Sequence, residues 1–358
     1  MIAGGGTGGH LFPALALAEA FQDREPDNEV LFVGSRKGLE ATVLNREGYA
    51  LKTIEVASLK GKPLWGKLWS LAAVPGSLVQ SWRLIRSFKP DLVLGVGGYA
   101  SGPVVLTAWA MGVKTAVQEQ NAFPGLSNRV LGKFVDWVFI SFAESDRHFP
   151  RRKVILTGNP VRKMIRQKKT GERKDPHAQF TLLIFGGSQG AHHLNQVMDE
   201  ALLHLGELKG RLRVIHQTGQ KDFSEVQQAY QREGVEAEVW PFIYDMDRAY
   251  DAADLILCRA GATTLFEVMA MGKPAILVPY PYAANDHQTF NARTLADTGA
   301  ALMVTNGDLT GAYLGAILKE LSGDPGRLKS IGDRAAVLAR PDAARTIVNL
   351  CYEMVGHG

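Results

Sequence analysis

Cysteine is scarce in this sequence, and long apolar runs are missing. The two cysteines, Cys258 and Cys351, provide neither a disulfide framework nor the paired spacing of a zinc site, and they suit a reducing compartment. No apolar run approaches the ~20 residues that a membrane-spanning helix needs. No signal-peptide pattern precedes the first glycines. We therefore expect a cytoplasmic protein without a spanning segment.

The length and composition are those of a soluble protein with two domains. The 358 residues exceed one ordinary hydrophobic core, 46% of them are apolar, and the formal net charge is only +4. Strand-like runs alternate with helical stretches and occur at 29–34, 91–96, 114–120, 180–187, 212–217, 254–259 and 273–279. This alternation predicts α/β domains with parallel sheets and right-handed crossovers.

Two pairs of motifs repeat along the chain. The opening "GGGTGGH" is answered by "FGGSQGA", and "AMGVKTAV" is answered by "AMGKPAIL". We therefore predict two doubly wound, Rossmann-like halves at 1–158 and 159–340, with a polar stretch at 162–179 between them. The sequence does not identify the docking partner of an amphipathic helix within 341–358, and packing back on the first half is one option.

The opening glycine loop is typical of phosphate binding, because a ligand can approach its backbone and the following helix N-terminus favours anions. Gly4, Gly6 and Gly9 also fit the dinucleotide pattern G-x-G-x-x-G. That pattern requires an acidic residue after the second strand, where Ser35 and Arg36 stand instead. A dehydrogenase is therefore disfavoured, and a tight turn without a ligand remains the other alternative.

His10 follows the loop at the start of the helix. At the mouth of a phosphate-sized loop, an imidazole can accept a proton near neutral pH. A histidine at a helix start can equally be a satisfied polar group without a chemical role. The local sequence leaves both interpretations open.

The second half contains further turns of the same kind. "GGSQGA" adds Ser188 and Gln189 to an anion-type loop, and "CRAGATTLFE" places small residues at a strand-to-helix junction. Glu267, one turn inside that helix, suits two ribose hydroxyls, and a solvent-facing carboxylate is the alternative. In "DHQTFNA", the amides of Gln288 and Asn291 suit a sugar, although Gln288 also fits a helix cap.

These motifs continue along nearly the whole chain as "GGGTGGH", "GGYASGP", "EQNAFPGLSN", "TGNPVR", "GGSQGA", "CRAGATTLFE" and "DHQTFNA". In this order they resemble the MurG-type glycosyltransferase family of peptidoglycan synthesis. The resemblance implies an inverting transfer of N-acetylglucosamine from UDP-N-acetylglucosamine to undecaprenyl-pyrophosphoryl-N-acetylmuramyl-pentapeptide, which converts lipid I to lipid II. It also implies the glycosyltransferase B fold, in which two Rossmann-like α/β domains with doubly wound parallel sheets face each other across the active cleft.

By this resemblance the second half binds the donor. Ile243 would contact uracil through its backbone, Glu267 the ribose and Ser188 the diphosphate, while Gln288 and Asn291 would contact the acetamido sugar. Residues of the first half complete the predicted donor site, which comprises Thr7, Gly8, Gly9, Asn121, Arg162, Ser188, Gln189, Ile243, Ala262, Thr263, Thr264, Leu265, Phe266, Glu267, Gln288 and Asn291.

The resemblance assigns the lipid-linked acceptor to the first half, with predicted contacts at Gly97, Gly98, Tyr99, Ser101 and Asn128. A base must take the proton of the attacking sugar hydroxyl, and His10 is the first choice for it, with Glu119 second. Helix N-termini and backbone amides would stabilise the departing diphosphate, so no metal or cofactor is required. The "DMD" at 245–247 resembles a metal-binding pattern, but a helix cap is the better interpretation.

The sequence departs from the family pattern at three positions. Gln118 stands where family members often carry histidine before "EQN", which argues against a proton-transfer role there and favours His10. Thr263 and Phe266 also replace side chains seen elsewhere in the family. Backbone contacts at these two positions should survive the change, whereas side-chain contacts need not.

The window from 56 to 90 contains no acidic residue, although it is rich in basic and aromatic side chains. Such a surface is typical of attachment to anionic lipid, while a core helix with solvated charges is the alternative. No nucleic-acid-binding module is present. We therefore predict peripheral attachment to the cytoplasmic face of the plasma (inner) membrane through Lys60, Lys62, Trp65, Lys67, Trp69, Trp82, Arg83 and Arg86.

Two other functions remain in competition at this stage. A UDP-N-acetylglucosamine epimerase can use a similar fold and donor, but it would need no lipid-facing patch. A non-catalytic nucleotide-sugar-binding protein would bind the donor without consuming it. Other proteins of cell-wall synthesis and division are possible partners by the resemblance.

Overall fold

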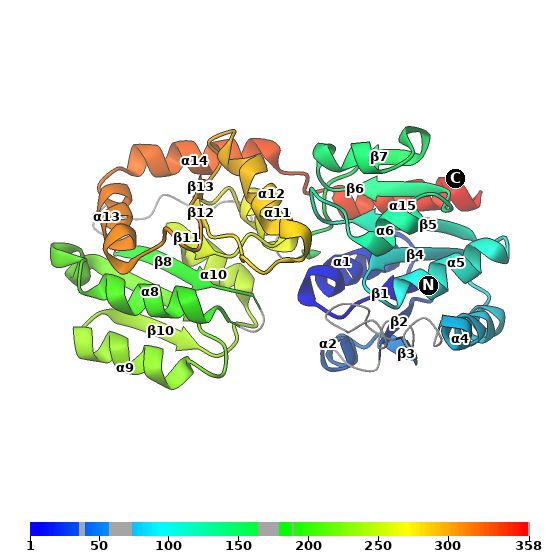
Figure 1. Ribbon diagram of the computed structural model, residues 1–358, viewed down its shortest axis with the longest axis horizontal. Helices are drawn as coiled ribbons and strands as arrows, with labels where there is room; N and C mark the ends of the chain where they lie inside the picture. Colours follow the sequence, from blue (N-terminus) through cyan, green and yellow to red (C-terminus); the bar gives the residue numbers. More distant parts are fainter. Residues whose placement is uncertain (36–39, 57–73, 164–178, 188–189, 357–358) are drawn as a thin grey trace. The chain divides into compact units, whose positions relative to one another are not determined.

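The computed structural model describes residues 1–35, 40–56, 74–163, 179–187 and 190–356. It divides into two compact units: unit 1 is Met1–Lys163 with Arg340–Gly358, and unit 2 is Met164–Ala339. Each unit is built on one parallel sheet with helices on both faces (Figure 1). The predicted class of two doubly wound α/β sheets is therefore confirmed.

The sheet of unit 1 has seven parallel strands in the order β3-β2-β1-β4-β5-β6-β7. Its strands are β1 (Ile2–Gly4), β2 (Leu31–Ser35), β3 (Ala50–Ile54), β4 (Leu92–Gly97), β5 (Lys114–Glu119), β6 (Trp137–Ile140) and β7 (Val154–Leu156). Its helices are α1 (Gly8–Arg24), α2 (Glu40–Arg46), α4 (Val74–Phe88), α5 (Ser101–Ala110), α6 (Leu126–Leu131) and α15 (Ala343–Val355), with short 3₁₀ turns at Ala143–His148 and Arg151–Lys153.

Alternate side chains of these strands fill two separate cores. Ile2 of β1 and Phe32 of β2 pack with α1 and α15 on one face. Their neighbours Ala3 and Val33 pack with α5 on the other face. Because both faces are covered, the inner strands β2 and β4 are apolar along most of their length, which explains why the sequence predicts them as apolar runs.

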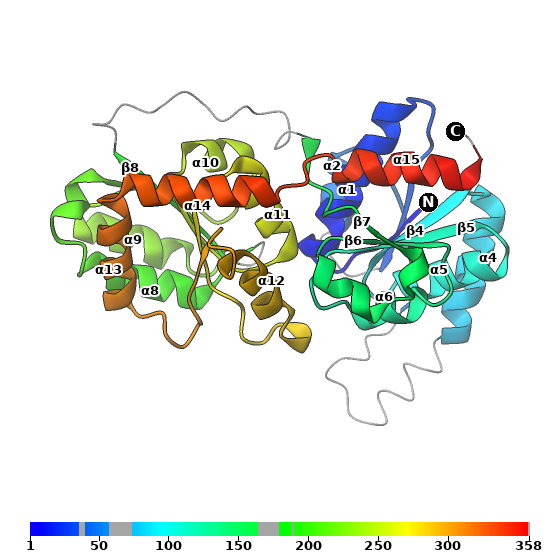
Figure 2. The same cartoon turned by 90° about the horizontal axis from the view of Figure 1, so that it is seen from above.

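Helix α15 follows unit 2 in the chain but belongs to unit 1, where it packs against α1 (Figure 2). The Arg24 guanidinium lies 4.3 Å from the centre of the Tyr352 ring, and Asn28 Nδ2 donates to Tyr352 Oη at 2.7 Å. Cys351 is buried in the core beneath, and burial raises the pKa of its thiol to about 12. This cysteine is therefore a packing residue.

The sheet of unit 2 has six parallel strands in the order β10-β9-β8-β11-β12-β13. Its strands are β8 (Phe180–Phe185), β9 (Leu212–Gln217), β10 (Glu236–Trp240), β11 (Leu255–Cys258), β12 (Ala275–Leu277) and β13 (Leu302–Met303). Its helices are α8 (His192–Leu202), α9 (Phe223–Glu233), α10 (Met246–Ala252), α11 (Ala262–Met271), α12 (His287–Ala296), α13 (Gly311–Ser322) and α14 (Pro325–Leu338), with 3₁₀ turns at Gly206–Arg211 and Ala284–Asp286.

The order of the strands reverses at one point in each sheet, between β1 and β4 in unit 1 and between β8 and β11 in unit 2. Ligands of doubly wound folds bind at the carboxyl ends of the strands beside such a switch point. The four loops that follow these strands are those that carry the motifs "GGGTGGH", "GGYASGP", "GGSQGA" and "CRAGATT". The fold thus brings the predicted motifs together in pairs, one pair in each unit.

Candidate active site

The first loop of unit 1 turns through three consecutive glycines. Gly4, Gly5 and Gly6 have φ values of 154°, 130° and 92°, which L side chains rarely adopt. Thr7 occupies the N-cap of α1 in an extended conformation without a side-chain capping bond, and the first turn contains no acidic residue. The loop therefore ends at the positive end of a long helix, an arrangement that binds anions.

The second loop of unit 1 lies directly against the first. The Gly5 amide donates to the Gly97 carbonyl oxygen at 3.3 Å. A Cβ atom on Gly98 would lie only 2.4 Å from the Gly5 carbonyl oxygen, and one on Gly97 would lie 2.9 Å from the His10 ring. The close approach of the two loops thus requires glycine at both positions.

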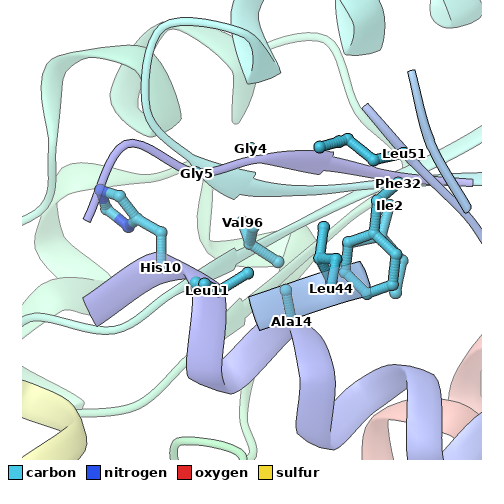
Figure 3. A pocket seen from close by; sticks show the side chains of 10 residues that line it. All are labelled: Ile2, Gly4, Gly5, His10, Leu11, Ala14, Phe32, Leu44, Leu51 and Val96. Atoms are coloured by element: carbon cyan, nitrogen blue, oxygen red, sulfur yellow. The ribbon is translucent and has the colours of Figure 1, made fainter. Parts of the chain in front are cut away.

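His10 lies half-buried in the first turn of α1, and its Nδ1 atom is 3.1 Å from Gln120 Oε1. The imidazole forms one end of a small, mainly apolar pocket, whose other end is formed by residues such as Phe32 and Leu44 (Figure 3). The residues that line it are Ile2, Gly4, Gly5, His10, Leu11, Ala14, Phe32, Leu44, Leu51 and Val96. The ring therefore sits between the glycine loop and an apolar wall.

Glu119, at the end of β5, is buried, and both of its carboxylate oxygens accept hydrogen bonds. Oε1 accepts from the Asn121 amide at 2.9 Å and from Asn121 Nδ2 at 3.2 Å. Oε2 accepts from the Gly125 amide at 3.1 Å and from Asn128 Nδ2 at 2.9 Å. Burial raises the pKa of this carboxyl, against the effect of these donors. Glu119 thus holds the loop between β5 and α6 in place.

The other predicted acceptor residues differ in exposure. Tyr99 is 44% exposed beside Gly98. Ser101 is fully buried, and its Oγ lies against Gly95 of β4, where a Cβ would be 2.5 Å away. Asn128 is also buried and uses Nδ2 to hold the end of β5. The structure therefore leaves Tyr99 as the accessible side chain of this set, while Ser101 and Asn128 support the loops.

In unit 2, Gln217 at the end of β9 joins two of the predicted donor segments. Its Nε2 donates to the Gly187 carbonyl oxygen at 2.8 Å, and its Oε1 accepts from the Ile243 amide at 2.8 Å. The Ile243 N–H is therefore engaged within the protein, so a uracil contact through it would have to displace Gln217. Ser188 and Gln189 lie outside the described residues.

Helix α11 begins directly after β11, with Gly261 at its N-cap and no acidic residue in its first turn. Among the predicted donor residues of this helix, Thr264 is half-buried and Ala262, Thr263, Leu265 and Phe266 are buried. Contacts from the buried positions would therefore be made by the backbone. Glu267 is only 5% exposed, and its Oε2 accepts from the Tyr250 hydroxyl at 2.9 Å. The alternative of a solvent-facing carboxylate is therefore wrong.

The two predicted sugar-binding amides on α12 bond to two different loops of unit 2. Gln288 Oε1 accepts from the Tyr280 amide at 2.9 Å, and Asn291 Nδ2 donates to the Ala260 carbonyl oxygen at 3.2 Å. Gln288 thus closes the loop and does not cap α12. Asn285 and Asp286 both have a φ of 53°, a left-handed conformation that stores backbone strain.

Three charged side chains, Arg162, Asp245 and Arg259, lie near the predicted donor segments in the sequence. The Arg162 guanidinium stacks 4.9 Å above the Phe12 ring, within unit 1. Asp245 takes the N-cap position of α10, as predicted, but its side chain makes no capping bond. Arg259, for which the sequence predicts no role, is buried after β11 and donates through one nitrogen to the Val278 and Pro279 carbonyls and to Asn306. The position of Arg259 in the sequence, just before the N-terminus of α11, is the feature that could have pointed to it.

The predicted membrane-facing set is described only in part, since Lys60, Lys62, Trp65, Lys67 and Trp69 lie outside the described residues. On α4, Trp82 is 42% exposed beneath the Arg86 guanidinium, and Arg83 is exposed as well. The neighbouring α5 adds Trp109, whose ring packs edge-on against Phe134. Both of these rings are partly exposed and were not predicted, because they fall outside the basic window. No described helix is long and apolar enough to cross a membrane.

Comparisons with known proteins address both units. Residues 1–140 match the glycosyltransferase family 28 N-terminal domain, and residues 181–347 match the family 28 C-terminal domain. A protein of Myxococcus xanthus is 49% identical over 99% of this chain and 92% of its own length, and one of Syntrophus aciditrophicus is 48% identical over 99% and 98%. Both are named UDP-N-acetylglucosamine--N-acetylmuramyl-(pentapeptide) pyrophosphoryl-undecaprenol N-acetylglucosamine transferase.

Solved structures agree with these matches. The crystal structure of MurG from Acinetobacter baumannii has a TM-score of 0.80 and 31% identity, and the similarity covers 99% of this chain and 98% of that one. A UDP-GlcNAc 2-epimerase from Neisseria meningitidis, bound to UDP-GlcNAc, has a TM-score of 0.68 over 98% of this chain and 99% of its own, but only 13% identity, which shows a common fold and no more. The chain therefore belongs to glycosyltransferase family 28, in its MurG-type branch, and has the glycosyltransferase B fold.

Proposed function

We propose that this protein transfers N-acetylglucosamine from UDP-N-acetylglucosamine to undecaprenyl-pyrophosphoryl-N-acetylmuramyl-pentapeptide, the step from lipid I to lipid II of peptidoglycan synthesis. The observation that carries the proposal is 48–49% identity to two transferases of that name over 99% of the chain. The two pairs of switch-point loops support it, because a donor and an acceptor that both contain a diphosphate need two separate anion-binding sites.

Unit 2 is the proposed donor site. The first turn of α11 faces the diphosphate with backbone N–H groups, and the buried Glu267 carboxylate accepts hydrogen bonds from the ribose hydroxyls. Ile243 marks the uracil position, and Gln288 with Asn291 the acetamido sugar. Arg162 supplements the nucleotide contacts by leaving its stacked position on Phe12.

Unit 1 is the proposed acceptor site, with the pyrophosphate held at the glycine loops and His10 as the general base. The geometry favours His10 over Glu119, because both oxygens of the Glu119 carboxylate already hold the loop of Asn121. In the reaction, the acceptor hydroxyl oxygen forms a bond to the anomeric carbon as His10 takes its proton. The bond from that carbon to the diphosphate breaks, and UDP leaves with the electron pair.

Stabilisation of the departing UDP comes from groups that the chain itself supplies. The negative charge that develops on the diphosphate is met by the N-terminus of α11 and by backbone amides of the loop after β8. The backbone N–H groups at the start of α11 are fixed in direction before the reaction, so they need no reorganisation as the charge appears. We therefore propose that the transfer requires no metal ion or cofactor.

We also propose that the protein attaches peripherally to the cytoplasmic face of the inner membrane. The half-exposed Trp82, with Arg83 and Arg86 beside it, lies on a helix that adjoins the exposed ring of Trp109. Aromatic rings and basic side chains together favour the headgroup region of anionic lipid. The lipid tail of the acceptor requires such proximity, and partners of cell-wall synthesis and division would meet the protein there.

Turnover of radiolabelled UDP-N-acetylglucosamine, with and without the lipid-linked muramyl acceptor, tests the transfer. We expect labelled lipid product and UDP only when the acceptor is present. Conversion of the free donor to its epimer would indicate the epimerase alternative, and binding without consumption would indicate a non-catalytic binding protein.

Co-sedimentation with vesicles that contain anionic phospholipid tests the attachment. Replacing Trp82, Arg83 and Arg86 by serine should release much of the protein from anionic vesicles at physiological salt, whereas neutral vesicles should bind little of either form. A matched triple replacement of the exposed residues Arg327, Lys329 and Val337 on α14, which also removes two cations and one apolar side chain, serves as the control. Equal binding of all three proteins would contradict the proposed surface.

A further inference from the structure

A buried pair of glutamines connects the His10 ring to the interior of unit 1. The Gln120 amide nitrogen lies near three acceptors: the Val96 carbonyl oxygen at 2.8 Å, the Gln118 carbonyl oxygen at 3.3 Å and Gln118 Oε1 at 2.5 Å. An amide oxygen placed there would face these oxygens without a proton between them. The nitrogen of Gln120 is therefore fixed on this side, and its oxygen is the atom that faces His10.

The orientation of Gln118 is fixed in the same way. Its Nε2 donates to Ser141 Oγ at 3.1 Å and to Asn159 Oδ1 at 3.1 Å. The Ser141 hydroxyl donates its single proton to the Glu119 carbonyl oxygen at 2.7 Å, so towards Gln118 it acts as an acceptor. Gln118, Gln120 and Ser141 are all at least 97% buried, which excludes water from rearranging the set. Backbone carbonyls thus orient Gln120 directly, and they orient Gln118 through the Ser141 hydroxyl.

We infer that Gln120 positions His10 as the Nδ1–H tautomer. Its Oε1 is 3.1 Å from His10 Nδ1 and accepts only, so Nδ1 must carry the hydrogen. In the neutral ring, Nε2 then holds the lone pair. Gln120 is a positioning residue, and its catalytic consequence rests on the function proposed above: Nε2 is the atom that takes the proton of the acceptor hydroxyl, while Nδ1–H keeps its bond to Gln120.

The nature of the partner also determines what Gln120 does to the ring. In a serine protease triad a carboxylate orients the histidine and stabilises its cation. An amide oxygen carries no net charge, so Gln120 selects the tautomer without the strong attraction for the imidazolium that a carboxylate would exert.

The tautomer can be measured without reference to turnover. Full-length protein labelled with ¹⁵N in histidine, at a pH where the ring is neutral, reports by NMR which ring nitrogen carries hydrogen, and the spectrum of His10→Ala identifies the His10 signals. We expect a protonated Nδ1 and an unprotonated Nε2. The reverse pattern would overturn the inference. The expected pattern in a protein without transferase activity would contradict the proposed function instead.

Two variants separate positioning from a general structural role. Gln120→Leu should shift the His10 signals towards Nε2–H and lower kcat by about 10²-fold, with the KM for the donor unchanged. Gln118→Leu removes a buried amide from the same cluster but leaves the Val96 carbonyl to orient Gln120, so the Nδ1–H pattern should persist. A Gln120→Leu protein with an unchanged tautomer would overturn the assignment, whatever its activity. The wild-type spectrum decides the question if either variant fails to fold.

Discussion

The switch points of the two units use the same backbone features but place different side chains beside them. Both have glycine turns that lead into a helix without acidic residues in its first turn, α1 in unit 1 and α11 in unit 2. In unit 1 the buried carboxylate of Glu119 accepts hydrogen bonds from loop donors at both oxygens. The titratable group beside the glycine loops there is the half-buried imidazole of His10. In unit 2 the buried carboxylate, Glu267, meets the Tyr250 hydroxyl next to the helix start. This difference supports the proposal that unit 1 handles the proton and unit 2 holds the nucleotide.

Removing the base should give the largest effect. His10→Ala should lower kcat by about 10²–10⁴-fold, since that is the usual contribution of a positioned general base. The affinity for UDP should change little, because the proposed nucleotide site is in unit 2. Steady-state kinetics and calorimetric titration of UDP measure the two quantities, with the exposed His204→Ala as the control. Near-normal turnover would remove His10 from this role.

A glycine-to-alanine substitution should affect the acceptor when it is made in unit 1 and the donor when it is made in unit 2. A Cβ on Gly98 would lie 2.4 Å from the Gly5 carbonyl oxygen, and one on Gly190 would lie 2.0 Å from the Thr218 carbonyl oxygen. Gly98→Ala should lower kcat/KM for the acceptor at least tenfold at unchanged UDP affinity, and Gly190→Ala should weaken UDP binding by a similar factor.

Gly6→Ala is the matched control for backbone strain. Gly6 has a φ of 92°, but among the described residues other than its chain neighbours no atom lies within 4 Å of its Cβ position. Gly6→Ala should therefore lower kcat/KM for the acceptor less than Gly98→Ala does. The change adds only conformational strain, on the order of 1 kcal/mol. If Gly98→Ala and Gly190→Ala impair the same substrate, the two units do not divide the substrates between them.

The two buried carboxylates should respond differently to the same substitution. Glu267→Gln should weaken UDP binding by about 10- to 100-fold, because hydrogen bonds to a charged acceptor are lost, and 2′,3′-dideoxy-UDP should be insensitive to it. Glu119→Gln should instead lower the free energy of unfolding by about 1–3 kcal/mol, since its new N–H₂ group would face two donors. Denaturant titration measures the stability of both variants, and calorimetry measures their affinity for UDP. A loss of stability in Glu267→Gln together with weaker UDP binding by Glu119→Gln would contradict this division.

The last prediction is a pH dependence of unit 2, whose effect is small near neutral pH and grows as the pH falls. Burial lowers the pKa of His216 from 6.5 to about 3, where the ring contacts the Tyr230 hydroxyl and Asn195. Below pH 6.5 the unfolded chain binds this proton and the folded chain does not. The stability of unit 2 is therefore complete above that pH and should fall by about 1.4 kcal/mol per pH unit towards pH 3. Denaturation of His216→Gln should show a shallower slope, and an equal slope would contradict the assignment.

Most strands inside the sheets could be predicted from the sequence, whereas the edge strands could not. The inner strand β6, with only four residues, is also missing from the predicted runs. All seven predicted runs are strands, because burial on both faces makes them continuously apolar. Edge strands such as β10, with alternating exposure, and β13, with two residues, lack that signal. The short β1 became visible only through the glycine loop that follows it.

Of the candidate site, the loops could be predicted, but the side chains that support them could not. Glycines with positive φ and helix starts have local sequence signals, and these identified all four loops. Gln120 and Gln217 stand at or just after the ends of strands and act on residues far along the chain, so nothing local distinguishes them from other polar residues. The same is true of Ser101, which was predicted to contact the acceptor and is fully buried against β4.

The return of α15 to unit 1 has a consequence for synthesis. The ribosome delivers this helix only after the whole of unit 2, which takes roughly 10–35 s at about 5–20 residues per second. Until then, the apolar side of α1 that Ile347 and Cys351 later cover has no partner. The nascent first unit must therefore wait with part of its core uncovered, and during that interval its exposed apolar surface is open to aggregation or to a chaperone.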